Sequence, residues 1–274
     1  LSQAVDNLSS EEKECLKQMS LPEFKAKLNK HYSLREKQAI VNVLATIGHG
    51  EAYAWLVSAE LLGEVQSTGA RSALTMQVLE EAKHFIVLRE LLHAFDLPIP
   101  RQSAWEYIFM EGVYKAKGLE KLFGMNIVVE SFALNLFGTF GEWPGMEILR
   151  LFHLDEARHT ALPQNYFSEF PMAKWTQKSP VKRLKRLKMI MPALILVAHL
   201  EEDLAELGLD SVELAGGILD RVTRLAERDG YYLPLGRLKL LNLLDKAFNL
   251  YCRLTREGHE GKTFVPREST ALAA

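Results

Sequence analysis

Cysteine is almost missing from this sequence. Cys15 and Cys252 are the two cysteines among 274 residues, which is too few for a disulfide framework or for a zinc site built from cysteines. We expect both to be free thiols in a reducing compartment. An excess of one charge is lacking as well, since the formal net charge is −2. Without a basic surplus, we expect no general affinity for nucleic acid or for an anionic membrane.

Long hydrophobic runs are also missing. The longest, at 189–200, is interrupted by Pro192 and contains His199, and it is shorter than the roughly 20 residues that span a bilayer. The chain starts Leu-Ser-Gln-Ala-Val-Asp, without the basic and apolar segments of a secretory signal. We therefore expect a cytoplasmic protein with no membrane partner.

Signals for β-strands are nearly absent, whereas helical spacing recurs along the chain. The patterns predict long helices over about 34–62, 71–95, 119–137 and 146–162, with turns at 63–69 and 138–145 and a partly helical connection near 104–116. Further helices are expected near 181–207, 212–228 and 235–256. No low-complexity linker divides the chain, so we predict one all-α domain over 1–274. Its bundle covers about 34–165, and additional helices cover about 180–256.

An internal repeat carries the chemistry. Leu79-Glu80-Glu81-Ala82-Lys83-His84 recurs as Leu154-Asp155-Glu156-Ala157-Arg158-His159, and an upstream glutamate precedes each copy, Glu51 and then Glu130. Residues at i and i+3 share one face of a helix, so the Glu and His of each Glu-x-x-His motif can reach the same point. One such motif is weak evidence for a site, but two with matching flanks are not.

The spacing around the turns supports the same grouping. In an antiparallel helical hairpin, residues equally far from the turn lie side by side. The midpoint in sequence between Glu51 and the Glu81/His84 pair falls inside the first predicted turn. The midpoint between Glu130 and the Glu156/His159 pair falls inside the second. Each set lies about 15 residues, or roughly 22 Å, from its turn at a rise of 1.5 Å per residue. We therefore expect all six side chains at one level of a four-helix bundle.

Such a cluster needs compensating charge, because buried charges must be paired or bound to metal. Two divalent cations would balance the four carboxylates, and ligands rich in oxygen with two imidazoles suit iron or manganese better than zinc or copper. One Glu from each of two helices and a Glu-x-x-His motif from each of the other two is the pattern of bundle-core di-iron and di-manganese sites. The predicted metal ligands are Glu51, Glu81, His84, Glu130, Glu156 and His159.

These segments resemble the ligand helices of the ferritin-like di-iron carboxylate superfamily. The resemblance covers about residues 34–165 and is strongest to the oxygen-activating branch, which includes bacterial multicomponent monooxygenase hydroxylases and the small subunit of ribonucleotide reductase. It implies a ferritin-like four-helix bundle with a long crossover between its second and third helices and with additional N- and C-terminal helices. It also implies that residues beside the ligands orient them by hydrogen bonds, here Asp155 with Arg158 and Glu80 with Lys83.

One feature of that branch has no counterpart. The reductases carry a radical tyrosine one turn after the first ligand histidine, where this chain has Leu88. The corresponding position after His159 is Pro163, which is more typical of a helix end. We therefore expect no stable tyrosyl radical.

The expected function is that of a non-haem di-iron oxidase or oxygenase, with manganese as an alternative at one metal position. It would activate O₂ and oxidise an unidentified organic substrate, small or apolar. The chain has no glycine-rich loop for a nucleotide or flavin, so electrons should come from a separate donor protein or from the substrate. We also expect a homodimer. A ferroxidase or iron-storage protein of bacterioferritin type is the alternative, although the long C-terminal extension favours a substrate pocket or partner surface. A metal-stabilised structural protein is a third interpretation.

Several other residues have competing interpretations. Glu60 lies about 180° around the helix from Glu51 and is expected at the surface. His153 is expected to be a packed histidine, with metal ligation as the alternative, and His49 and His199 are expected to be structural. The basic residues Lys182, Arg183, Lys185, Arg186 and Lys188 fit one exposed helix face, or a docking site for an acidic donor protein. Phe85, Phe132, Phe137, Phe140 and Trp143 are expected in the core, with a substrate channel as the alternative.

Overall fold

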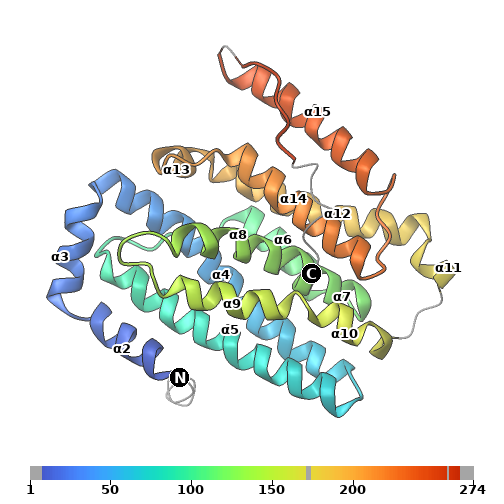
Figure 1. The fold of residues 1–274 in the computed structure, drawn as a ribbon, viewed down its shortest axis with the longest axis horizontal. Coiled ribbons are helices and arrows are strands. Elements are labelled where there is room, and N and C mark those ends of the chain that lie inside the picture. The colour runs from blue at the N-terminus through green and yellow to red at the C-terminus, as the bar shows by residue number, and fades with distance from the viewer. Residues whose placement is uncertain (1–7, 171–173, 258, 266–274) are drawn as a thin grey trace.

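The helices of the computed structural model group around a central bundle, shown in Figure 1; it describes residues 8–170, 174–257 and 259–265. The bundle contains α4 (Leu34–Glu64), α5 (Thr68–Ala94), α8 (Glu130–Phe140) and α9 (Leu149–His159). α7 (Leu119–Phe123) and the π-helix η1 (Gly124–Val129) lead directly into α8 and form one long rod with it. No strand occurs in these described ranges, and the predicted all-α class is confirmed.

α4 and α5 form the first hairpin, and its ends follow from the sequence. Ser33 and Glu36 form a reciprocal capping box at the start of α4. At the start of α5, the Ser67 side chain accepts a hydrogen bond from the backbone N–H of Ala70. The Glu169 carboxylate accepts the backbone N–H groups of Gln66 and Ser67 at 3.0 and 3.1 Å. The tight connection holds the two helices antiparallel, as the spacing of Glu51 from Glu81 and His84 requires.

The α7–η1–α8 rod is the central element of the bundle. By length and composition Leu119–Phe140 could cross a membrane, but 83% of its most apolar window is buried inside the protein. A helix that is apolar on all sides needs burial on all sides, and here the neighbouring helices provide it. The bundle core is therefore built around this rod.

The rod differs from the predicted third helix in its middle. A continuous α-helix was expected over 119–137, but residues Gly124–Val129 form a π-helix and α8 then continues to Phe140. π-helical turns are rare and occur frequently at functional sites. A Cβ atom on Gly124 would lie 3.1 Å from the Val113 side chain, so glycine allows the rod to approach the crossover here. The π-turn directly precedes Glu130.

The second hairpin also differs in detail from the prediction. α9 begins at Leu149 and ends at His159, whereas the expected helix covered 146–162. After a short turn the chain continues into α10 (Leu162–Tyr166), with Pro163 in its first turn, where proline is well tolerated. Pro163 therefore marks a helix boundary, as the sequence indicated. η2 (Phe167–Glu169) and α11 (Lys174–Gln177) follow.

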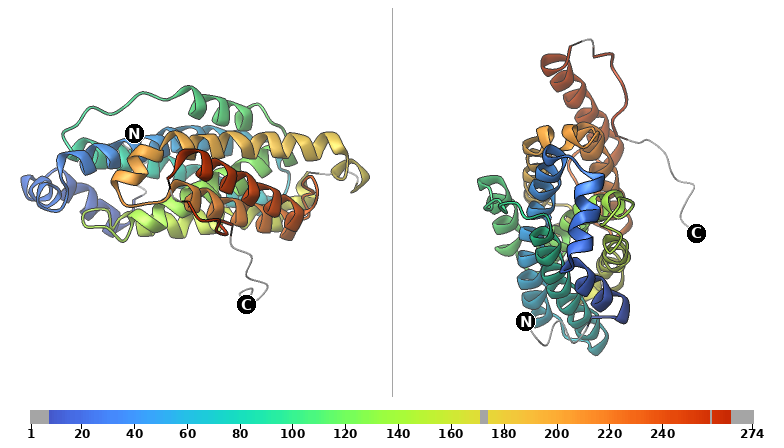
Figure 2. Two further views of the ribbon diagram at one scale, coloured as in Figure 1. Left: turned by 90° about the horizontal axis from the view of Figure 1, so that it is seen from above. Right: turned by 90° about the vertical axis from the view of Figure 1, so that its left-hand side faces the viewer.

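Other helices cover the bundle from outside. The long crossover between α5 and α7 carries α6 (Ala104–Tyr114) along one flank, as Figure 2 shows. α12 (Pro180–His199) packs against α6, and α14 (Ser211–Arg228) packs against α8. α13 (Glu201–Glu206) lies on α4, α2 (Ser10–Met19) lies on α5, and α3 (Pro22–His31) follows α2. α15 (Arg237–Thr255) packs on α14 and extends away from the bundle (Figure 1).

The predicted exposed basic face of α12 is wrong at Arg186. Its side chain is fully buried, and it donates to both oxygens of Glu120 at 2.9 and 3.1 Å. Its guanidinium also lies over the Tyr231 ring, 5.1 Å from the centroid. A planar guanidinium is well suited to such a bidentate, stacked position. Arg186 therefore anchors α12 to α7, while Lys185 and Lys188 remain exposed.

Candidate metal centre

Six polar side chains from the four bundle helices meet inside the core. None is more than 3% exposed. One comes from α4, two come from α5, one is the first residue of α8, and two come from α9. They are Glu51, Glu81, His84, Glu130, Glu156 and His159. The structure brings together the whole set that the internal repeat singled out.

Their ligand atoms form two overlapping groups. Within each group, one atom from every member lies within 4.8 Å of the others. The first group is Glu51, Glu81, His84 and Glu156, and the second is Glu81, Glu130, Glu156 and His159. Two adjacent metal positions that share two carboxylates have this composition.

The two shared carboxylates divide their oxygens between the two histidines. Glu156 places Oε1 2.9 Å from Nδ1 of His84 and Oε2 2.8 Å from Nδ1 of His159. Glu81 places Oε2 3.9 Å from Nδ1 of His84 and Oε1 3.3 Å from Nδ1 of His159. Glu81 and Glu156 therefore lie between the two histidines, where each could offer one oxygen to each candidate metal position, and Nδ1 is the nitrogen that each histidine turns toward these two shared carboxylates.

Several of these atoms are buried without a hydrogen bond. In the first group, Glu51 Oε2, Glu81 Oε2, His84 Nδ1 and Glu156 Oε1 make no hydrogen bond of good geometry, although His84 Nδ1 lies 2.9 Å from Glu156 Oε1. Buried polar atoms without a well-formed hydrogen bond are uncommon and destabilising, and here four of them belong to one candidate metal position. Four carboxylates also match the charge of two divalent cations. The residues present therefore fit a two-metal site.

Without metal, protons would supply part of the positive charge that the cluster requires. Burial raises the pKa of Glu51 and of Glu130 well above the usual carboxyl range, and the nearby charges of Glu156 and Glu81 raise both further. Burial opposes a charge on His159, but the surrounding carboxylates outweigh it and raise the pKa of this imidazole well above its usual value. Metal would have to displace these protons, so binding should strengthen as the pH rises.

The hydrogen bonds that orient the histidines cross between α5 and α9. Asp155 on α9 lies 3.1 Å from Nε2 of His84 on α5. Glu80 on α5 lies 2.9 Å from Nε2 of His159 on α9. Arg158 donates to both acids, at 2.7 Å to Glu80 and by a shorter contact to Asp155. A carboxylate therefore faces Nε2 of each histidine, and Nδ1 is the nitrogen turned to the cluster, where it could act as a ligand.

Two buried amides support the carboxylates, and our reasoning from sequence missed both. Gln77 donates to Glu81 at 3.0 Å and to Glu130 at 2.9 Å. Asn126, in the π-helix, donates to the Gln77 side chain at 2.9 Å and to the backbone carbonyl of His159 at 3.2 Å. A signal was available, because each amide lies four residues before a ligand glutamate and therefore shares its helix face.

A third missed residue comes from outside the bundle. Glu12 on α2 is 4% exposed and lies 2.8 Å from the Lys83 ammonium. Lys83 in turn lies 2.7 Å from Asp155, which bonds His84. This contact joins α2 to the candidate centre through three charged side chains. The spacing of Ser9 and Glu12 is typical of a capping box, but nothing local in the sequence indicates that Glu12 contacts Lys83.

A small cavity adjoins the centre on the α4–α8 side. Its volume is ≈ 30 Å³, and Glu51 lies in its wall. The other lining groups are mainly apolar and include Phe109, Phe132, Ala133 and Leu196. Of the aromatic residues considered for a channel, Phe132 lines this cavity, whereas Phe137 and Phe140 are fully buried in the core. The cavity gives Glu51 an apolar neighbourhood.

The other candidates lie outside the cluster. Glu60 is at the surface, as expected, and pairs with Lys121. His153 turns Nδ1 to the backbone carbonyl of Leu134 at 3.0 Å, which fits the packed interpretation. His49 pairs with Glu106 at 2.7 Å, and His199 is exposed.

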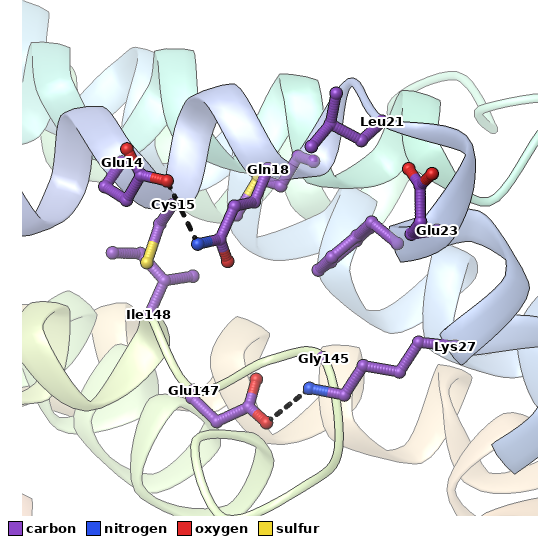
Figure 3. Close-up of a pocket in the computed structure, with 11 residues that line it drawn as sticks. Glu14, Cys15, Gln18, Leu21, Glu23, Lys27, Gly145, Glu147 and Ile148 are labelled. Atoms are coloured by element: carbon purple, nitrogen blue, oxygen red, sulfur yellow. Dashed lines mark hydrogen bonds and ion pairs between the residues drawn. The ribbon is translucent and has the colours of Figure 1, made fainter.

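A separate hollow of ≈ 430 Å³ lies between the N-terminal helices and the α8–α9 turn (Figure 3). Its walls carry the Lys27–Glu147 ion pair and the Cys15 thiol. Burial and nearby acids raise the pKa of Cys15, so the thiol is a poor nucleophile at neutral pH. None of the six clustered residues lines this hollow, which is consequently no part of the candidate centre.

Comparison with known proteins gives a likeness in fold. No protein-family model and no curated protein matches this chain. Among solved structures, it is similar to a protein from Synechococcus described as protein 19 with aldehyde deformylating oxidase activity. The two are 14% identical, the TM-score is 0.58, and the match covers 78% of this chain and 98% of the other. The likeness confirms the predicted ferritin-like helical bundle.

Proposed function

We propose that this protein is a di-metal oxidase or oxygenase that uses O₂ to oxidise a small or apolar organic substrate. The two overlapping ligand groups, which share Glu81 and Glu156, carry this proposal. Iron at both positions is preferred, with manganese as an alternative at one, because the set combines four carboxylates with two imidazoles. The printed activity of the Synechococcus protein, an oxidase, is consistent with this class of chemistry.

The residues around the centre would each have a defined task. Two ferrous ions held there would supply electrons and open coordination positions for O₂. Gln77 keeps Glu81 and Glu130 in place through its amide. Phe152 lies 4.2 Å from the His84 ring, between centroids, and together with Phe137 excludes water from that side. The apolar cavity beside Glu51 supports an apolar reacting group in the substrate.

Aerobic reaction of ferrous-loaded protein tests the proposal. Wild type should consume O₂ and gain near-ultraviolet absorption as Fe(II) becomes Fe(III). Glu51→Ala should lose most of this reaction, because it removes a ligand of the first group. Glu60→Ala provides the matched control, since it removes an exposed glutamate from the same helix, and it should react like wild type. If the wild-type ferrous protein stayed unchanged in air for hours, the function would have to be structural.

A size measurement separates the oxidase from the ferroxidase alternative. An iron-storage protein of bacterioferritin type assembles into a large cage, whereas the proposed oxidase should elute as a small oligomer, expected to be a homodimer. Continued iron uptake far beyond two ions per chain would favour storage.

A further inference from the structure

A groove lined by lysines runs between α6 and α12, on the flank of the bundle. Its volume is ≈ 550 Å³, within the range of about 300–1,000 Å³ that is usual for small-molecule sites. Five of its lining residues are Lys115, Lys117, Lys182, Lys185 and Lys188. A concave surface with this many ammonium groups attracts anions.

The positive charge in the groove is only partly neutralised. Lys115 lies 2.7 Å from Glu111, and Lys182 lies 3.5 Å from Glu120. Glu120 is the one carboxylate in the lining, and Arg186 already occupies both of its oxygens. Among the described residues, no carboxylate pairs with Lys117, Lys185 or Lys188, and all three are exposed. Lys185 and Lys188 are three residues apart on α12 and therefore share one helix face, so these two ammonium groups can hold one anionic group together.

The rest of the groove is apolar and leads toward the candidate centre. Ile108, Phe109, Met189 and Pro192 also belong to its lining. Phe109, only 3% exposed, lines both this groove and the cavity that contains Glu51. The Phe109 ring therefore separates a basic groove from the apolar space beside the metal ligands.

We propose that the groove binds the substrate as an amphiphile with a single anionic head group, a carboxylate or a phosphate. The head lies at Lys185 and Lys188, and the apolar chain follows Ile108 and Met189 to Phe109. When the Phe109 ring turns aside, the end of the chain reaches the cavity at Glu51. This substrate class rests on the proposed function, because it assigns the centre an organic substrate. A small ligand is favoured over an acidic protein because the lysines surround a concavity with a buried aromatic floor.

Equilibrium titrations of the metal-loaded chain test the head group. Dodecanoate and dodecyl phosphate should bind, whereas dodecyltrimethylammonium, with the same chain and the opposite charge, should not. The relative affinities of the first two show which anion the lysines prefer. Lys185→Gln combined with Lys188→Gln should weaken dodecanoate binding by about tenfold or more. The matched control, Lys30→Gln with Lys239→Gln, removes two exposed lysines on α3 and α15 and should bind like wild type.

A series of carboxylates of increasing length tests the apolar floor. If the chain lies on Ile108 and Met189, affinity should rise by up to about fourfold for each buried methylene. Ile108→Ser, a change at a half-exposed side chain, should reduce this increment. Equal binding of all lengths would overturn the proposal, as would unchanged affinity in the double lysine variant. Tight lysine-dependent binding of a short poly-glutamate peptide without binding of dodecanoate would identify a protein docking site instead.

Metal analysis keeps this inference separate from the proposed function. The double lysine variant should retain the wild-type metal content and the aerobic Fe(II) oxidation. A protein that binds metal and consumes O₂ but binds neither dodecanoate nor dodecyl phosphate refutes the substrate class alone. A protein that binds dodecanoate through the lysines but takes up no metal refutes the oxidase alone.

Discussion

Replacing Glu12 by Gln should destabilise the protein although the residue lies outside the bundle. The substitution removes the negative charge that lies 2.8 Å from Lys83 but keeps an oxygen that can accept the Ser9 amide in the capping box. Lys83 is only 13% exposed in its side chain, so its lost partner is poorly replaced by water. A charged hydrogen bond of this kind contributes about 2 kcal/mol, which corresponds to a melting temperature roughly 4–8 °C lower.

Thermal unfolding of metal-loaded protein at neutral pH measures this loss. Glu11→Gln is the matched control, because Glu11 is an exposed acid in the first turn of the same helix. A double-mutant cycle with Lys83→Met would isolate the pairwise contribution. If Glu12→Gln and Glu11→Gln melted at the same temperature, the contact between α2 and Lys83 would contribute nothing, and the reasoning would be refuted.

The effect of Glu12 should also depend on pH in one direction. Burial opposes its ionisation, but hydrogen bonds from Lys83 and Ser9 outweigh burial and hold the pKa of Glu12 below its usual value of 4.5. A lowered folded-state pKa stabilises the protein above the unfolded pKa, and that contribution disappears as the pH falls through the folded pKa. The difference in melting temperature between wild type and Glu12→Gln should therefore be largest near neutral pH. It should disappear as the pH falls below 4.5. A difference that persisted in acid would have another cause.

Three further predictions concern the centre itself. Elemental analysis of protein made with ample iron should find two metal ions per chain, and one ion per chain would contradict the shared-carboxylate arrangement. Removing the metal should lower the melting temperature at neutral pH, because the buried carboxylates then repel one another or take up protons; equal melting temperatures would mean that the cluster is open to solvent. Asp155→Asn should still bind metal but react with O₂ about 10–100 times more slowly. His159→Ala should lose metal, whereas His153→Ala, a change on the same helix, should keep it.

Much of the fold could be predicted because its determinants are local or repeated. The capping residues Ser33 and Ser67 begin the two helices of the first hairpin, and the turn between them sets the register of Glu51 against Glu81 and His84. Since both hairpins obey the same spacing, six side chains were expected at one level, and the structure brings them together. Their metal ligation stays a prediction.

The features that sequence reasoning missed depend on contacts between distant segments. A capping box distinguishes Glu12 from Glu11 in the sequence, but the contact of Glu12 with Lys83 depends on how α2 packs on α5. Arg186 is buried against Glu120 and Tyr231, of which one precedes it and the other follows it by more than 40 residues in the sequence. All six residues of the π-turn at Gly124–Val129 are buried, so the apolar pattern of the segment does not distinguish a π-turn from an α-helix.

The crossed hydrogen bonds of Asp155 and Glu80 have a consequence for how the protein folds. Each carboxylate orients a histidine of the opposite hairpin, so an isolated hairpin contains a histidine without its anchor. The ring orientations are set only when the two hairpins have docked, which makes the centre a late product of folding. Local opening of either hairpin should free both imidazoles in a single cooperative event. In hydrogen exchange, the ligand-bearing turns of α5 and α9 should consequently open together, with one shared free energy.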